Sequence, residues 1–127
     1  MSDQFTYSKK VIKYFKNPKF AHEMKNPDAF AQLGNIRCGD VFKIFLKFKD
    51  GKVREITYLS YGCMAALAAC ESFCRLVKGK TIEEAKKIGY QDIKNDLGDL
   101  PEFKVHCTMM VVETFKKAMK NYKKKKE

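Results

Sequence analysis

The sequence predicts an α+β domain in which a small antiparallel sheet of about three strands packs against several α-helices. Two observations support this fold class. Residues 42–60 show the alternation and the central turn of a β-hairpin, and helical patterns lie on both sides of it. The 127 residues contain no internal repeat and no linker-like stretch, so we expect residues 1–127 to form a single domain.

The chain opens with an amphipathic helical pattern. Residues 5–16 place apolar side chains at helical spacing, and Asn17-Pro18 ends the pattern. We therefore predict an N-terminal helix within residues 1–17. A second Asn-Pro pair lies inside residues 18–30, which predicts irregular chain there.

A short extended piece over residues 31–37 leads into the turn Cys38-Gly39-Asp40, and the hairpin follows. Apolar residues alternate with lysines from Phe42 to Phe48, so one face of this strand should be buried. Asp50-Gly51 is a strong two-residue hairpin turn, and the return strand is expected over residues 52–60.

Helical patterns make up the rest of the chain. Residues 64–77 are rich in Ala and Leu and contain neither Pro nor Gly. Thr81 to Glu84 forms a capping box that opens a short helix, and residues 90–99 favour a further helical turn. A stripe of apolar residues at helical spacing runs through residues 103–122 and predicts a long last helix.

The formal net charge of +11 is concentrated at the two ends of the chain. Residues 1–26 carry six Lys against two acids, and residues 116–127 carry seven Lys against one acid. Residues 27–115 are nearly neutral, with 13 basic and 12 acidic side chains. We interpret residues 121–127 as a solvated basic tail. Because no base-stacking motif accompanies this charge, we expect no nucleic-acid partner.

The composition also indicates the cellular compartment in which the protein is expected. No apolar run approaches the roughly 20 residues of a membrane span, and the N-terminus lacks the features of a signal peptide. Five cysteines are an odd number without an export signal, which favours reduced thiols. We therefore expect a cytoplasmic protein with no membrane partner. The sequence leaves open whether it is a monomer or a homo-oligomer.

The cysteines contain no CxxC pair, which disfavours a zinc ribbon or a ferredoxin-type cluster loop. Cys63 and Cys107 lie at the starts of predicted helices, where unpaired N–H groups and the helix dipole favour a thiolate. Together with Cys38 in its turn, three thiols in three separate connections could converge on one end of a small sheet. Soft thiolates of this kind suit a metal site.

Cys70 and Cys74 share a helical stripe with Leu67 and Val77, so we interpret them as core residues. An alternative is that Cys70, two turns after Cys63, is an auxiliary thiol of the same site.

His106 and Cys107 suggest a nucleophile with its base, but adjacent residues on a helix point about 100° apart. With no orienting Asn or Asp and no oxyanion loop identified, we expect no catalytic residues and no enzyme activity.

Five segments of the sequence, taken in order, resemble those of a known protein family. They are YSKKVIKYFKNP (7–18), CGD (38–40), YGCMAALAA (61–69), VKGKTIEEA (77–85) and HC (106–107). In this order and spacing the chain resembles the U-type iron–sulfur cluster scaffold proteins, the IscU/NifU N-terminal family. The resemblance covers nearly the whole chain and implies an α+β fold of that type.

The resemblance implies a scaffold on which a [2Fe–2S] cluster is built and then handed to acceptor apoproteins. Iron would come from the cellular pool, and sulfur from a cysteine desulfurase or another sulfide source. Carried over by position, Cys38, Cys63 and Cys107 match the cluster cysteines, and Asp40 matches the nearby aspartate. His106 and Lys104 match residues close to the site.

Asp40 and His106 compete for the place of the fourth ligand. We favour Asp40, because a short Cys-Gly-Asp turn can aim both side chains at one site, and His106 becomes an alternate ligand. Without a cluster, Cys38, Asp40, Cys63 and Cys107 could hold Zn²⁺. The alternative function is a zinc-bound sulfur carrier that works with a cysteine desulfurase, with the persulfide on Cys107.

One segment departs from the family. The family's chaperone-recognition segment reads LPPVK, whereas residues 100–104 read LPEFK. The second proline is lost and an acid is introduced, which weakens the expectation of docking to an Hsp70-type chaperone.

Overall fold

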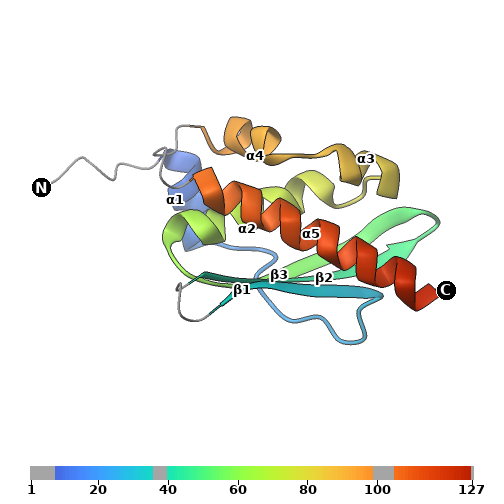
Figure 1. Ribbon diagram of the computed structural model, residues 1–127. Coiled ribbons are helices and arrows are strands. Elements are labelled where there is room, and N and C mark those ends of the chain that lie inside the picture. Colours follow the sequence, from blue (N-terminus) through green and yellow to red (C-terminus); the bar gives the residue numbers. More distant parts are fainter. Residues whose placement is uncertain (1–7, 36–39, 99–104, 127) are drawn as a thin grey trace, which may run out of the picture.

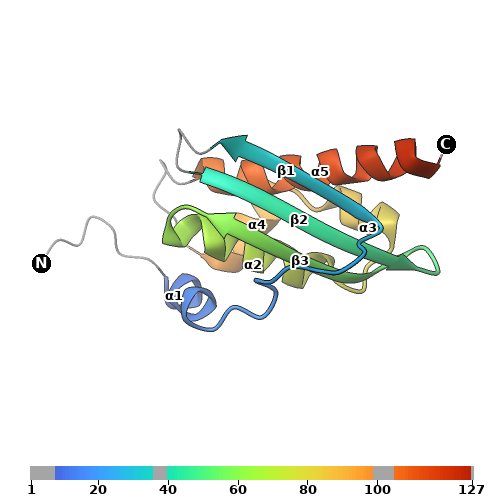
Figure 2. The same ribbon diagram turned by 90° about the horizontal axis from the view of Figure 1, so that it is seen from below.

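Figure 1 shows the computed structural model, which describes residues 8–35, 40–98 and 105–126. Three antiparallel strands form one sheet in the order β1-β2-β3, and the helices cover one face of it. The segment between the first helix and β1 follows the edge of β3 and continues beneath the opposite face (Figure 2). The α+β fold class and the three-stranded sheet predicted from the sequence are confirmed.

The N-terminal helix α1 spans Lys9–Lys16. Ser8 caps it, because the Ser8 hydroxyl accepts a hydrogen bond from the backbone N–H of Val11 at 3.1 Å. Val11 and Tyr14 are buried, as the sequence pattern predicts. The cap sets the helix start at residue 9 rather than residue 5, and the part of the prediction that concerns residues 1–7 lies outside the described residues.

The sheet comprises β1 (Ala29–Asn35), β2 (Asp40–Lys49) and β3 (Lys52–Tyr61). The hairpin is confirmed: Asp50 and Gly51 both have positive φ, 54° and 73°, which matches the twist of the two strands. β1 starts two residues before the predicted position. The reason is Asp28, whose N–H donates to the Leu46 carbonyl at 2.7 Å and whose carboxylate accepts from the Phe48 N–H at 2.8 Å.

The core lies between the sheet and two helices, α2 (Met64–Val77) and α5 (Val105–Lys126). The bounds of α2 are those predicted, because the sequence gives this helix no internal breaker. Cys70 and Cys74 are fully buried, which confirms their assignment to the core. Phe73 of α2 meets Phe115 of α5 edge to face, with ring centroids 5.1 Å apart.

Two short helices, α3 (Ile82–Lys87) and α4 (Tyr90–Leu97), connect α2 to the last helix. Thr81 and Glu84 form the predicted capping box at the start of α3.

Residues 121–126 of the predicted basic tail are the last residues of α5, and their solvation stays a prediction. The Tyr122 ring packs on Phe48 with centroids 4.6 Å apart, and the Asn121 side chain donates to the Phe30 carbonyl at 3.2 Å. These contacts hold the end of the helix on the sheet.

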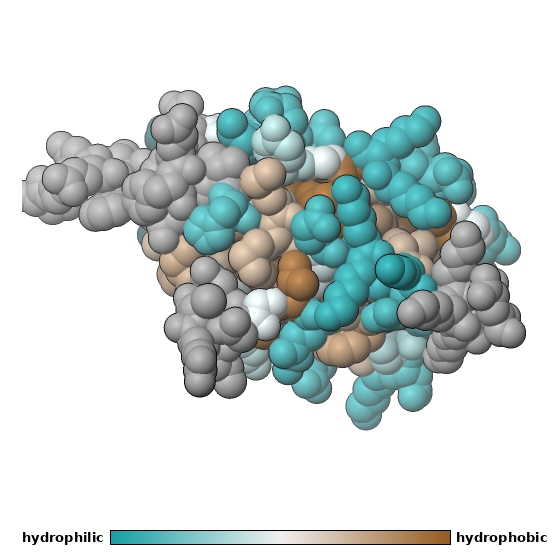
Figure 3. All heavy atoms as spheres, in the orientation of Figure 1, coloured by the Kyte–Doolittle hydropathy of each residue, from teal (hydrophilic) through white to brown (hydrophobic). Residues whose placement is uncertain are grey.

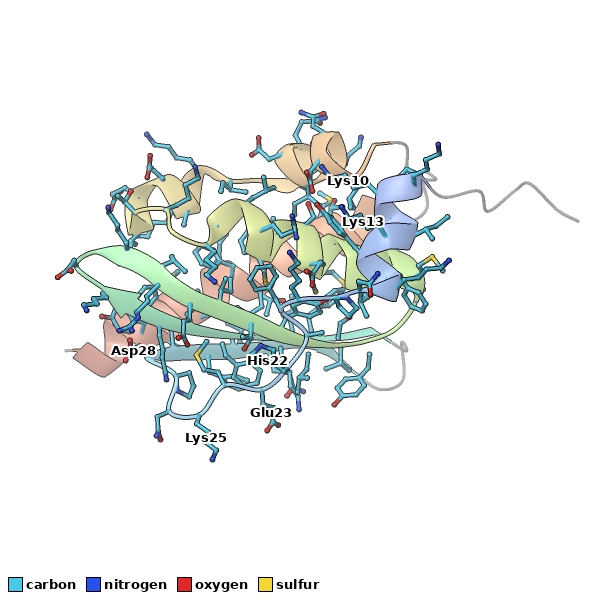
Figure 4. All side chains as sticks on the ribbon, turned by 180° about the vertical axis from the view of Figure 1, so that it is seen from behind. Lys10, Lys13, His22, Glu23, Lys25 and Asp28 are labelled. Carbon is cyan, nitrogen blue, oxygen red and sulfur yellow. The ribbon has the colours of Figure 1, made fainter. Side chains whose placement is uncertain are left out.

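A buried acid, Glu71, attaches the segment that follows α1 to α2. The carboxylate of Glu71, which is fully buried, accepts from the N–H groups of Lys19 and Phe20 at 2.9 and 3.3 Å. It also accepts from the Tyr58 hydroxyl at 3.0 Å. The chain that follows these anchored residues, labelled from His22 to Asp28 in Figure 4, passes along the sheet away from α1.

Candidate metal centre at one end of the sheet

Four element ends meet at one end of the molecule. The start of β2, the end of β3 and the starts of α2 and α5 lie together in both ribbon views (Figures 1 and 2). Strand register agrees with this placement, because Val41 pairs with Tyr61 and Cys63 follows two residues later. The cysteine-bearing connections predicted to converge are thus brought to one end, as far as they are described.

Cys63 occupies the N-cap position of α2 and is half-buried. Its backbone carbonyl accepts from the N–H groups of Ala66 and Leu67 at 3.1 and 3.3 Å, but its side chain caps no helix N–H. The thiol therefore stands at the positive end of the helix dipole without serving as a cap. A helix N-terminus stabilises a negatively charged thiolate. This matters for a metal site, because a cysteine binds a metal ion as the thiolate and not as the thiol.

Cys107 is the third residue of α5 and is fully buried. The first turn of α5 holds no acidic side chain that would repel a thiolate. Both cysteines predicted to start helices are confirmed in those positions.

The expectation that helical spacing keeps the His106 and Cys107 side chains from interacting is wrong. The Nε2 atom of His106 lies 3.8 Å from the Cys107 Sγ atom, although both residues belong to α5. They lie in the first turn, where no preceding helical turn restricts the rotamers of the imidazole, so the exposed ring can lean over its neighbour.

Cys70 approaches the site from inside the core. Burial raises the pKa of the Cys70 thiol well above its usual range, and the nearby Cys107 and Glu71 add to the rise. Cys70 is therefore a neutral thiol at neutral pH, and its role as an auxiliary thiol stays a prediction. No local pattern predicts that Cys70 lies near Cys107, because the two residues belong to separate helices, α2 and α5.

Cys38 and Lys104 lie outside the described residues, and only the backbone of Asp40 is described, as the first residue of β2. Among the described residues, no three His, Cys, Asp or Glu side chains form a group that could hold a metal ion. The four-residue ligand set consequently stays a prediction. None of the described helices is long and apolar enough to cross a membrane.

Comparison with known proteins agrees with this architecture. Residues 6–127 match the family model of the NifU-like N terminal domain. The chain is 36% identical over 119 residues to the Archaeoglobus fulgidus "Iron-sulfur cluster assembly scaffold protein IscU 1", which covers 94% of this chain and 78% of that protein. It is 35% identical over 125 residues to the IscU scaffold protein of Escherichia coli K12, covering 95% and 97% of the two chains.

Two solved structures share the fold. A scaffold protein of the SUF system from Fervidobacterium islandicum has a TM-score of 0.71 at 21% identity, covering 88% of this chain and 95% of that one. The N-terminal part of a NifU-like protein from Brucella abortus also has a TM-score of 0.71, at 18% identity and 97% coverage of both chains. The model match and the identities, which span nearly the whole chain, show that this protein belongs to the NifU-like N-terminal domain family, that of the IscU-type scaffolds.

Proposed function

We propose that this protein is a scaffold on which an iron–sulfur cluster of the [2Fe–2S] type is assembled and then passed to acceptor apoproteins. One observation carries the proposal. Cys63 and Cys107 begin two helices at the end of the molecule where β2 starts, and Cys38 and Asp40 are at or just before that start in the sequence. Relatives of the same family carry the name of cluster assembly scaffolds.

The proposed ligands are Cys38, Asp40, Cys63 and Cys107. Two irons need four protein ligands, and stable electron carriers supply four thiolates. A harder carboxylate oxygen in place of one thiolate should bind the cluster less firmly, which suits transfer. In this scheme the residues hold and release the cluster and catalyse no reaction.

The proposed ligand set also bears on the source of sulfur and on the metal held before cluster assembly. Sulfur would come from a cysteine desulfurase or another sulfide source, because the described part of the chain offers no group that makes sulfide. Before cluster assembly the same three thiolates and one carboxylate would suit tetrahedral Zn²⁺.

The test is assembly without oxygen. Protein purified anaerobically and supplied with Fe²⁺ and sulfide should become coloured, with about two irons and two acid-labile sulfides per site. The colour should pass to an added apo-ferredoxin. Cys74→Ala, which changes a buried thiol of the core, serves as the control and should assemble normally. Failure to bind iron and sulfide, with persulfide transfer to Cys107 intact, would establish the sulfur carrier instead.

A second pair of variants identifies the fourth ligand. Asp40→Ala should make the cluster more labile or change its absorption spectrum, whereas His106→Ala should keep the cluster. If His106→Ala loses the cluster and Asp40→Ala does not, the assignment of Asp40 is wrong. The 3.8 Å approach of His106 to Cys107 makes this comparison informative, because the imidazole is near enough to exchange into the site.

A further inference from the structure

A second surface feature lies between α3 and the C-terminal half of α5, away from the Cys107 end of that helix. It is a hollow of about 280 Å³ lined by Lys86 of α3 and by Phe115, Lys116, Met119 and Lys120 of α5. Met119 is half-buried and Phe115 is almost completely buried, so the Met119 side chain supplies most of the accessible apolar floor. The three lysines are exposed and form a cationic rim. Figure 3 shows hydrophobic residues between hydrophilic ones on this face.

The fold does not need this concentration of charge. Lys116 and Lys120 are four residues apart on α5, and like charges at that spacing destabilise a helix by a few tenths of a kcal/mol. The dipole of α5 does not explain them either, because its effect is limited to the last turn and the helix continues to Lys126.

The lysines of the rim are also poorly neutralised. Lys116 lies 3.9 Å from Glu113, but both side chains are more than 60% exposed, so the pair contributes little. Among the described residues, no carboxylate forms an ion pair with Lys86 or Lys120. The rim thus presents nearly uncompensated positive charge around an apolar floor.

We propose that this hollow is a docking site for an acidic protein segment that inserts one large apolar side chain between the three lysines. The three lysines favour a partner with acidic side chains, because opposite charges attract across an interface. The apolar floor favours an inserted apolar side chain. A volume of about 280 Å³ lies just below the range of sites for drug-sized small molecules, which fits a single side chain.

Two other occupants fit less well. A nucleic acid would use the lysines but not the apolar floor, since a ring as buried as Phe115 offers no face on which a base can stack. A membrane surface would require large apolar side chains that protrude. The exposed large apolar residues lie elsewhere in the described chain: Ile12, Phe15, Phe30, Tyr61, Tyr90 and Met109.

The site is independent of the proposed cluster chemistry. Lys116 and Lys120 follow Cys107 by 9 and 13 residues, which corresponds to about 14–20 Å along the helix axis. A partner held at the hollow would therefore leave the cysteine end of α5 uncovered.

The test uses a 12-residue synthetic peptide of Asp and Glu with one central Phe, titrated into the full chain by calorimetry and amide NMR at low salt. Amide shifts should concentrate in α3 and the second half of α5. Exchanging the central Phe for Ser should weaken binding by about tenfold, because the buried aromatic contact is lost. Lys116→Glu with Lys120→Glu should weaken it at least as much and should leave cluster assembly unchanged.

Lys9→Glu with Lys13→Glu is the matched control, because it makes the same change in charge at the same spacing on α1 (Figure 4 labels Lys13). Binding by this control should change less than twofold. The proposal is overturned if the peptide does not bind, if the Phe and Ser peptides bind equally, or if the control loses as much affinity. Tighter binding of a 20-nucleotide single-stranded DNA or of anionic phospholipid vesicles would also overturn it, and would identify the other occupant.

Discussion

The two ends of α5 have opposite characters. The first turn carries Cys107, fully buried, with no acidic residue beside it. The last eleven residues, 116–126, contain seven lysines and no acid. One end thus suits the binding of metal and the other the attraction of negative charge. The proposed cluster site and the proposed docking site thus lie at separate places on one helix, so it should be feasible to alter each without the other.

The rigidity of α5 makes this separation meaningful. Phe115 contacts Phe73 of α2 near the middle of the helix, and Tyr122 contacts Phe48 of β2 near its end. Because both halves pack on the same core, a substitution at one exposed end should not move the other. The predictions below test that independence, beginning with the largest expected effect.

Cys107→Ser and Cys63→Ser should each lose nearly all of the cluster formed on reconstitution, because a hydroxyl is a far poorer ligand for iron than a thiolate. The measurement is iron and acid-labile sulfide per chain. Lys116→Glu, at the other end of α5, should retain the wild-type content. Wild-type iron content in Cys107→Ser would contradict the assigned ligand, and loss in Lys116→Glu would contradict the separation of the two ends.

Glu71→Ala should lower the free energy of unfolding by about 3 kcal/mol, because two backbone N–H groups and the Tyr58 hydroxyl lose their buried acceptor. Urea unfolding measures this directly. Glu71→Gln should cost less, since the amide oxygen still accepts. Because Phe73 of α2 packs on Phe115 near the middle of α5, cluster retention and peptide binding should fall together on mild heating of Glu71→Ala. If only one of them falls, the two ends do not share a rigid support.

Much of the fold was predictable because its signals are local. The turn at Asp50-Gly51 requires positive φ, and α2 contains no breaker between Met64 and Val77. Elements whose limits depend on distant partners were placed less well. β1 begins two residues early, where Asp28 bonds to β2. α5 runs to Lys126, four residues past the apolar stripe that predicted it. The partners of Asp28 lie on β2, so no local pattern around residue 28 predicts this strand start.

The candidate site shows the same division. Cys63 and Cys107 were assigned to helix starts from local patterns, and both assignments are confirmed. The contact of His106 with Cys107 was missed, because a periodicity rule fixes Cβ directions but not how a long ring rotates in a first turn. Glu71 was not recognised as buried, since its partners lie on a separate segment and on β3.

Asp96→Asn should lower the unfolding free energy by about 1–2 kcal/mol and loosen α1. Desolvation opposes ionisation of Asp96, but hydrogen bonds from Lys10, Ser72 and Tyr14, at 2.7, 2.7 and 3.1 Å, outweigh it and lower the pKa of the carboxyl. A lowered pKa gives stability that is present above the unfolded-state pKa of about 3.9 and lost as the pH falls through the folded-state value.

The difference between wild type and Asp96→Asn should therefore be full at pH 6 and shrink towards pH 3, as thermal unfolding across that range would measure. A difference that stays constant with pH would show that the amide replacement acts through packing and not through charge. Neither end of α5 should respond, because the Asp96 network joins α4 to α1 and α2.

The smallest expected change in stability comes from substitutions that distinguish two faces of the lysine-rich half of α5. The Lys117 ammonium donates to the Gln32 carbonyl at 2.9 Å, and the Asn121 amide donates to the Phe30 carbonyl at 3.2 Å. Both acceptors belong to β1, an edge strand whose outer carbonyls could otherwise pair with another chain. These two side chains therefore serve the sheet, whereas Lys116 and Lys120 face the hollow.

Lys117→Ala with Asn121→Ala should cost only about 1 kcal/mol, since exposed hydrogen bonds contribute little, but should increase self-association through the uncovered edge. Sedimentation velocity at increasing protein concentration measures the association. Lys116→Ala with Lys120→Ala is the matched variant: it should stay as monodisperse as wild type and lose acidic-peptide binding, which the first variant should largely keep. If both variants behaved alike in both assays, the basic half of α5 would act as a diffuse charge, and the assignment of separate roles to its two faces would fail.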